Sequence, residues 1–172
     1  QQREDYKVTF LKPNKDGIIT ADQVKNALKE DTIFVSLMHV NNEIGAINPI
    51  NEIGQVIQSY KQSIVYHVDA VQSFLKLKIN LENIDLLSIS GHKVHAPKGI
   101  GALYIREKTK IHPLLTGGGQ EMQFRSGTEN TAYIAGLSKA IDIQKGSLSE
   151  DLNRIKKLRE KFILNLKSEI TD

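Results

Sequence analysis

Three short apolar runs, each followed by polar residues, constrain the fold of this chain more than any other feature. They span residues 32–38, 64–68 and 86–90, and each has the length and composition of a strand buried in a parallel sheet. Amphipathic helical patterns precede the first two runs, at residues 20–28 and 48–60. Alternating strands and helices predict an α/β protein with a mixed, mostly parallel sheet and flanking helices.

Local signals predict where the helices begin. Thr20 opens a capping box, and Asn48 followed by Pro49 is typical of a helix start. Ser147 opens a second capping box, which predicts that a long amphipathic helix begins there. Two further strands are expected at residues 8–11 and 101–106.

Charge and hydropathy argue against a nucleic-acid or membrane protein. The 23 Lys and Arg residues nearly balance the 20 Asp and Glu residues, for a net charge of +3. The densest basic cluster, residues 154–161, includes Glu160 and has the pattern of a solvated helix face. No apolar run has transmembrane length and no charged-then-apolar leader is visible, so the expected location is the cytoplasm.

The chain contains no cysteine, which excludes disulfides, thiolate metal sites and a cysteine nucleophile from these residues. His92 and His95 are three residues apart in a predicted loop, but no third ligand has suitable spacing, and no metal site is predicted. His39 is expected to be a core histidine in preference to a group that supports a site. His67 alternates with Val65 and Asp69 on one strand face and is expected to be buried and hydrogen-bonded.

Polar side chains gather where the predicted strands end. Ligands of open α/β sheets bind at the carboxyl ends of the strands. Taken singly, Asp69 fits a helix cap, His92 a loop residue and Lys93 a solvated cation. Together, these groups can form one site for an anionic, nitrogen-containing ring compound. The residues after the three strands are His39, Asn41, Asn42 and Glu43, then Asp69 and Gln72, then Ser90, Gly91, His92 and Lys93.

Four segments resemble, in the same order, those of cysteine desulfurases, pyridoxal-phosphate-dependent enzymes of the class V aminotransferase family. The segments are M-H-V-N-N-E-I-G (38–45), Y-H-V-D-A-V-Q-S (66–73), S-I-S-G-H-K-V-H-A-P-K-G-I-G-A-L-Y (88–104) and G-G-G-Q-E-M-Q-F-R-S-G-T-E-N (117–130). The resemblance implies that residues 1–145 are part of the cofactor-binding large domain of the aminotransferase-type fold, known as fold type I. Residues 146–172 are expected to form a helix leading toward a small domain.

The resemblance also implies the two central roles of the site. Lys93, in the S-G-H-K motif, matches the catalytic lysine that binds pyridoxal 5'-phosphate as a Schiff base, for which it must lose its proton. Asp69 matches the aspartate that pairs with the pyridinium nitrogen. A carboxylate at that position keeps the ring protonated, and the protonated ring acts as the electron sink.

Five further positions match cofactor-binding residues of the family. Asn42 and Gln72 resemble residues that hydrogen-bond the ring oxygen, although either could be an ordinary cap or turn residue. Ser90 and His92 match residues that contact the phosphate. Thr128 resembles a threonine that reaches the phosphate of the neighbouring subunit, which implies a homodimer with shared sites.

The implied activity converts L-cysteine to L-alanine and passes sulfur, as a persulfide, to an iron-sulfur scaffold or another acceptor protein. Family members are longer, and the persulfide cysteine and the arginine that binds the substrate carboxylate are not among these residues, so this chain alone is expected to be inactive. Alternatives are a selenocysteine lyase, another class V enzyme, or a non-catalytic dimerisation or interaction fragment. A nucleotide-binding module ranks last, because no glycine fingerprint is complete.

Overall fold

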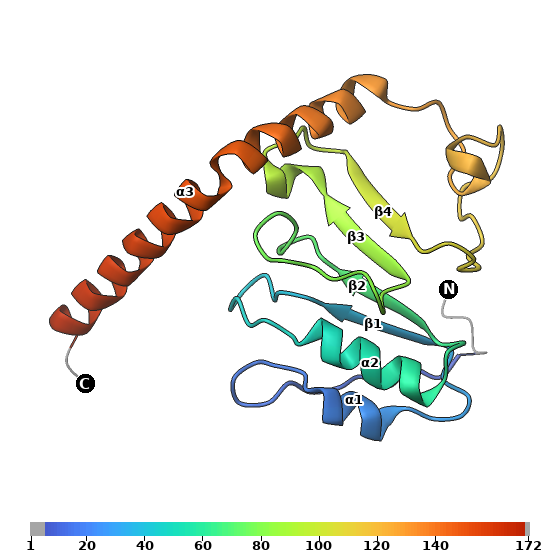
Figure 1. Cartoon of the computed structure of the whole chain (residues 1–172), viewed down its shortest axis with the longest axis horizontal. Helices are drawn as coiled ribbons and strands as arrows, with labels where there is room; N and C mark the ends of the chain where they lie inside the picture. Colours follow the sequence, from blue (N-terminus) through green and yellow to red (C-terminus); the bar gives the residue numbers. More distant parts are fainter. Residues whose placement is uncertain (1–5, 171–172) are drawn as a thin grey trace.

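The computed structural model describes residues 6–170 and contains a four-stranded sheet (Figure 1). Its strands are β1 (Phe34–Met38), β2 (Val65–Asp69), β3 (Leu86–Ser90) and β4 (Gly101–Ile105), in the spatial order β1-β2-β3-β4. β1, β2 and β3 are parallel, whereas β4 is antiparallel to β3. The predicted mixed, mostly parallel α/β sheet is confirmed.

One face of the sheet forms the main core. Tyr66 and Val68 alternate along β2 with half-buried residues and are fully buried. Helix α2 (Ile50–Tyr60) packs over this face through Ile53 and Ile57, and helix α1 (Ala21–Ala27) lies against α2 (Figure 1). Because apolar side chains recur on one stripe of α2, the helix buries that stripe and leaves its polar side in water.

The helix starts agree with the sequence in one case and differ in another. The Thr20 capping box is present, with its hydroxyl accepting from the Gln23 N–H. Asn48 does not cap α2, because its side chain is buried and bonded elsewhere: Oδ1 accepts from the Ile19 N–H at 2.8 Å and Nδ2 donates to the Met38 carbonyl at 2.8 Å. The asparagine therefore joins the segment before α1 to the end of β1.

The long helix begins earlier than its second capping-box signal predicts. Helix α3 (Thr131–Glu169) is continuous through Ser147 and is capped instead by Asn130, whose side chain accepts from the Tyr133 N–H. Its first half packs on the body through Leu137 and Ala140, and its second half extends away from the sheet (Figure 1). Because helical hydrogen bonding was already established at Thr131, an internal Ser/Glu pair has no free N–H to cap.

The strand predicted at residues 8–11 is wrong. This segment has no strand pairing, and the side chains of Val8 and Phe10 are 70% and 89% exposed. β-branched and aromatic residues favour a strand only where a neighbour supplies hydrogen bonds. Among residues 6–170, no helix combines the length and apolar character that crossing a bilayer requires.

Candidate functional site

Parallel pairing brings the polar ends of β1, β2 and β3 to one edge of the sheet. Met38 is in register with Asp69, and Asp69 with Ser88. The pairing continues past the strands, because the His39 N–H donates to the Asp69 carbonyl and the Ala70 N–H to the Ser88 carbonyl, each at 2.9 Å. The first residues after each strand therefore lie side by side, as ligand sites of open sheets require.

Lys93 lies in a tightly held turn directly after β3. This 3-10 helix, η1 (Gly91–Val94), ends at His95 in the left-handed conformation, with φ of 62°. The Gly91 N–H donates to the Ile100 carbonyl at 2.8 Å, and the Ala96 N–H donates back to the Gly91 carbonyl at 3.0 Å. Val94 is 1% exposed and packs against α3, which anchors the turn while the neighbouring Lys93 side chain stays half-buried.

Ser90 and His92 form a pair at the start of this turn. Ser90 Oγ and His92 Nδ1 are 2.8 Å apart, and the imidazole is exposed. When both ring nitrogens carry protons, the Nδ1–H donates to Ser90 Oγ, and the Ser90 hydroxyl and the His92 Nε2–H can then both donate to an anion. The two residues predicted to contact a phosphate thus lie in direct contact with each other.

Asp69 is half-buried at the end of β2 and has one carboxylate oxygen engaged. Its Oδ1 atom accepts from the Val71 N–H at 2.9 Å, so the ordinary turn-capping role expected of an isolated aspartate is also present. This bond fixes the side chain in place. Asp69 ends the strand next to the one that leads into the Lys93 turn, so the structure brings the two predicted central residues to neighbouring positions on the same edge.

Gln72 and Lys93 lie on two segments joined by a residue that the sequence analysis missed. The Nζ atom of Lys76 donates to the Gln72 carbonyl at 3.2 Å and to the Lys93 carbonyl at 3.4 Å. Burial lowers the pKa of Lys76, and the positive charge of Lys93 lowers it further. Its spacing of four residues from Gln72 was the available signal, but the contact with Lys93 spans 17 positions and depends on the fold.

The structure separates the roles of the neighbouring Asn41 and Asn42. The Asn41 Oδ1 atom accepts from the N–H groups of Glu43 and Ile44, at 2.9 and 3.0 Å, and so shapes the loop after β1. The Asn42 side chain is exposed and makes no hydrogen bond within the described residues. Asn42 is therefore the amide of the pair that is free to meet a ligand.

Thr128 is exposed in the segment between β4 and α3, three positions before α3 begins. Within the described residues its side chain makes no hydrogen bond to the residues at this edge. Its predicted role toward a neighbouring subunit remains a prediction.

The two strand histidines differ in their hydrogen bonding. His39 is 5% exposed, which confirms it as a core histidine, but its Nδ1 atom has no partner within the described residues. His67 is half-buried and satisfied at both nitrogens, by Ser36 Oγ and Ser88 Oγ at 2.8 Å each. Burial lowers the pKa of both imidazoles, and the charge of Asp69 partly offsets this effect on the pKa of His67.

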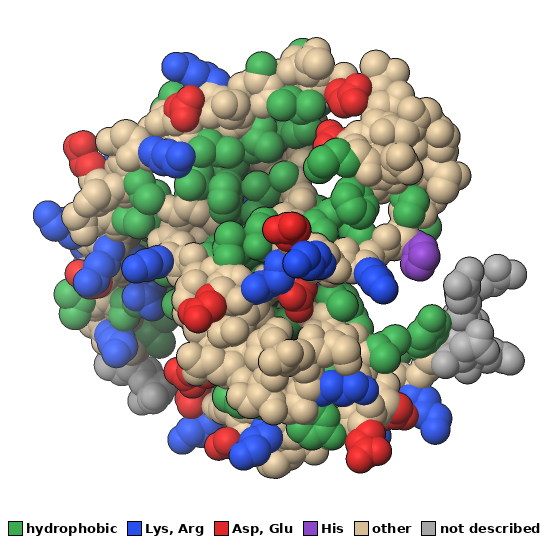
Figure 2. Space-filling view, turned by 45° about the vertical axis from the view of Figure 1, so that its right-hand side comes forward, with side chains coloured by type: hydrophobic (Ala, Val, Ile, Leu, Met, Phe, Trp, Pro, Cys, Tyr) green, Lys and Arg blue, Asp and Glu red, His purple; other side chains and the backbone are tan. Residues whose placement is uncertain are grey.

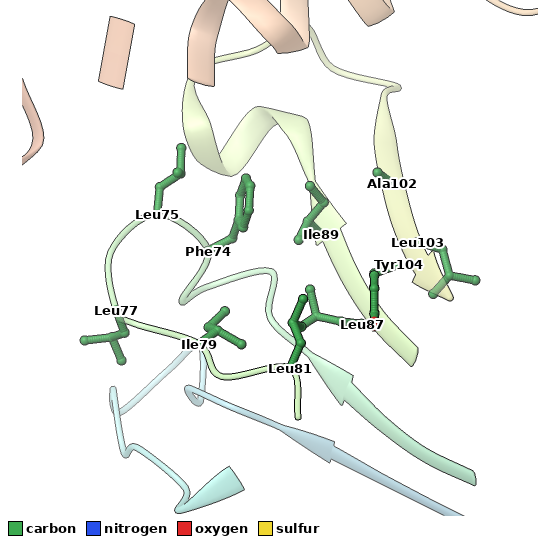
Figure 3. A pocket seen from close by; sticks show the side chains of 10 residues that line it. All are labelled: Phe74, Leu75, Leu77, Ile79, Leu81, Leu87, Ile89, Ala102, Leu103 and Tyr104. Carbon is green, nitrogen blue, oxygen red and sulfur yellow. The ribbon is translucent and has the colours of Figure 1, made fainter. Parts of the chain in front are cut away.

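An apolar pocket lies elsewhere. Figure 2 shows hydrophobic side chains gathered in a hollow on one face of the molecule, with charged side chains of both signs around it. A pocket of about 480 Å³ lies between β3, β4 and the segment after β2 (Figure 3). None of the predicted site residues lines it, and its lining side chains are apolar apart from the Tyr104 hydroxyl. It is lined by Phe74, Leu75, Leu77, Ile79, Leu81, Leu87, Ile89, Ala102, Leu103 and Tyr104.

Comparison with known proteins agrees with the resemblance seen in the four motifs. The family model described as aminotransferase class-V matches residues 1–170. A cysteine desulfurase IscS from Dictyoglomus turgidum is 44% identical over 169 residues, which cover 97% of this chain and 42% of that protein.

Solved structures share the fold. One described as a NifS-like protein superposes with a TM-score of 0.91 at 37% identity, covering 95% of this chain and 46% of its own. Another, described as SspA in complex with cysteine, has a TM-score of 0.76 at 42% identity and covers 87% of this chain and 46% of its own. The chain thus spans less than half the length of these relatives.

Proposed function

The chain belongs to the class V aminotransferase family, and from this premise we propose that the intact protein is a pyridoxal-phosphate-dependent cysteine desulfurase. Class V aminotransferases and cysteine desulfurases depend on pyridoxal 5'-phosphate. In this proposal the described residues supply the part of the cofactor site that contains Lys93. The observation that carries it is the meeting of Asp69 and the Lys93 turn on adjacent strand ends.

The side chains at this edge fit the cofactor by their chemistry. The amine suits the aldehyde of the cofactor, and the carboxylate suits its ring nitrogen. The amides suit the ring oxygen, and the hydroxyl–imidazole pair suits the phosphate. Lys93 would bind covalently and Asp69 would pair with the ring nitrogen. The remaining contacts are proposed for Asn42 and Gln72 at the ring oxygen, for Ser90 and His92 at the phosphate, and for Thr128 at the phosphate of the partner subunit.

Once bound, the cofactor supplies an electron sink for bonds broken at the substrate α-carbon. The residues of this chain hold and orient it. Lys93 attacks only as the neutral amine, so it must give up its proton before it binds the aldehyde. The Asp69 carboxylate is fixed through the Val71 N–H and would favour a proton on the ring nitrogen of the bound cofactor.

The proposed substrate is L-cysteine, with L-alanine and an enzyme persulfide as products. Support comes from the cysteine desulfurase relative and from the related SspA structure described with cysteine. Since this chain has no cysteine, these 172 residues do not supply the sulfur-accepting thiol. A homodimer, an iron-sulfur scaffold or other acceptor protein as partner, a cytoplasmic location and the division at residue 145 stay predictions of the same proposal.

The proposal is tested in the full-length protein with pyridoxal phosphate as the probe. The wild type should show the visible absorption band of a lysine-bound cofactor, and borohydride reduction should fix the cofactor on the peptide that contains Lys93. Lys93→Ala should lose both signals. Lys98→Ala, a change at an exposed lysine five residues away, should keep them.

Product analysis then separates the alternatives. Alanine formed from L-cysteine, together with sulfide released from the persulfide when a reducing thiol such as dithiothreitol is added, supports the desulfurase, whereas activity with selenocysteine alone indicates a lyase. A folded wild type without the band contradicts the proposal and favours a non-catalytic role.

A further inference from the structure

We propose that Lys76 is a positioning residue that holds the Lys93 turn in place through hydrogen bonds to two main-chain carbonyls. The inference rests on the proposed function, in which Lys93 binds the cofactor. It adds a residue that is not among the proposed cofactor contacts. No other described side chain donates to the carbonyl of Lys93.

The contact joins two segments that each contain a proposed cofactor ligand. The Lys76 Nζ atom lies 3.2 Å from the Gln72 carbonyl and 3.4 Å from the Lys93 carbonyl. An ammonium group has three N–H donors and no acceptor, so one lysine can serve both carbonyls at once. Bonds from a charged donor are stronger than neutral ones, and Lys76 is half-buried, which limits competition from water.

The backbone just before Lys76 has a strained conformation. Leu75 has φ of 62°, a left-handed conformation that leucine rarely adopts. Such strain persists only where the surroundings hold it. Phe74 and Leu75 pack against the buried cluster that includes Val94, and in Figure 3 both side chains extend toward the turn above them.

The turn is thus held from two directions by consecutive residues. Phe74 and Leu75 pack against the apolar cluster that contains Val94, and Lys76 reaches the carbonyl of the adjacent Lys93. Burial lowers the pKa of Lys76, and the positive charge of Lys93 adds to this effect. Removing the Lys76 ammonium should therefore loosen the turn and also change the electrostatic surroundings of the Lys93 side chain.

The first test measures hydrogen exchange in the full-length protein without cofactor. The amides of His95 and Ala96, which both donate to the Gly91 carbonyl, report on opening of the turn. Lys76→Met should raise their exchange rates by about tenfold, as expected for one lost charge-assisted bond. Lys76→Arg, which keeps the charge and donors, should restore part of the protection, and Lys78→Met, at an exposed neighbouring lysine, should change nothing.

The second test measures how fast pyridoxal phosphate becomes attached to Lys93, followed by its absorption band. Lys76→Met should slow attachment by about three- to tenfold, while Lys76→Arg and Lys78→Met stay closer to wild type. Equal exchange and equal attachment rates in Lys76→Met and Lys78→Met overturn the inference. If Lys76→Met does not fold, Lys76→Gln, which keeps two N–H donors without the charge, replaces it with the same expected order.

The two proposals fail in distinguishable ways. Absence of the absorption band in the wild type contradicts the proposed cofactor role of Lys93. Faster exchange at His95 in Lys76→Met would still support the positioning role of Lys76. A normal wild-type band together with unchanged exchange in Lys76→Met contradicts the positioning role of Lys76 and does not affect the proposed function.

Discussion

The Nε2 atom of His67 lies 2.8 Å from the Oγ atom of Ser88, while the Nδ1 atom of the same ring lies 2.8 Å from Ser36 Oγ. The imidazole therefore links three adjacent strands by side chains alone, on the sheet face opposite α2. Each hydroxyl can donate or accept, so the neutral ring satisfies both of its nitrogens. Phe34 stacks on the ring at a centroid distance of 6.2 Å and increases its burial.

This arrangement predicts a pH dependence of stability. Burial lowers the pKa of His67 in the folded state below the ordinary value of 6.5. Between the two pKa values the unfolded chain binds more protons, so the free energy of unfolding should rise with pH up to about 6.5 and then level off. In urea unfolding of the full-length protein, the free energy of unfolding of His67→Gln should differ less between pH 5.5 and pH 7.5 than that of the wild type.

A matched control for this experiment is His112→Gln, because His112 is exposed. That variant should keep the wild-type difference between the two pH values. An identical pH dependence in wild type and His67→Gln would show that the imidazole does not stay neutral in the fold.

Asn48 gives a second prediction, about stability. Its buried side chain serves the Ile19 N–H and the Met38 carbonyl, and its own N–H donates to the His39 carbonyl. Asn48→Ala leaves a donor and an acceptor without partners, so the free energy of unfolding should fall by about 2–4 kcal/mol. Chemical denaturation measures it, with the exposed Asn51→Ala as control. Equal stability of the two variants would mean that water replaces the side chain at no cost.

Arg106 gives a third prediction. Its guanidinium donates to the carbonyls of Leu81, Glu82 and Ile84 and lies 3.1 Å from an Asp85 carboxylate oxygen. Lysine cannot reproduce this fork, because its donors share one nitrogen. Arg106→Lys should therefore lower the free energy of unfolding by about 1–3 kcal/mol, whereas Arg159→Lys, at an exposed position on α3, should stay near wild type. If Arg106→Lys unfolds at the same temperature as the wild type, this account is contradicted.

Local patterns predict the positions of the sheet strands well, because each strand coincides with an apolar run in its own sequence. The apolar run at 86–90 matches β3 residue for residue, and the Thr20 capping box is made by side chains three positions apart. The strand ends, and with them the edge that gathers Asp69 and Lys93, follow from the parallel order.

Signals that depend on distant partners were not predictable in this way. Asn48 precedes a helix as a cap would, but bonds to Ile19 and Met38 were more favourable once the chain had folded. The Ser147 signal is overridden because α3 has already begun. Lys76 was missed because nothing near it in sequence indicates a contact with Lys93.

Gly91 gives the last prediction, which concerns the turn itself. A Cβ atom at this position would lie 2.6 Å from Ile100 Cγ2, 2.9 Å from the Ile100 carbonyl oxygen and 3.2 Å from Ala96 Cβ. The carbonyl cannot retreat without breaking its bond from the Gly91 N–H, so the strand and the turn must separate. Gly91→Ala should lower the free energy of unfolding by about 1–3 kcal/mol and, by displacing Lys93, weaken binding of pyridoxal phosphate by at least about tenfold.

Titration of the full-length apo-protein with pyridoxal phosphate, alongside thermal unfolding, measures both effects. The control is Gly146→Ala in α3, where an added Cβ meets no atom within 4 Å. That change should leave cofactor binding unaltered and raise helix stability by about 0.5–1 kcal/mol, since alanine loses less backbone entropy than glycine. If Gly91→Ala binds the cofactor as tightly as Gly146→Ala, the close approach of Gly91 to Ile100 does not set the position of Lys93, and the turn must be held by its other contacts.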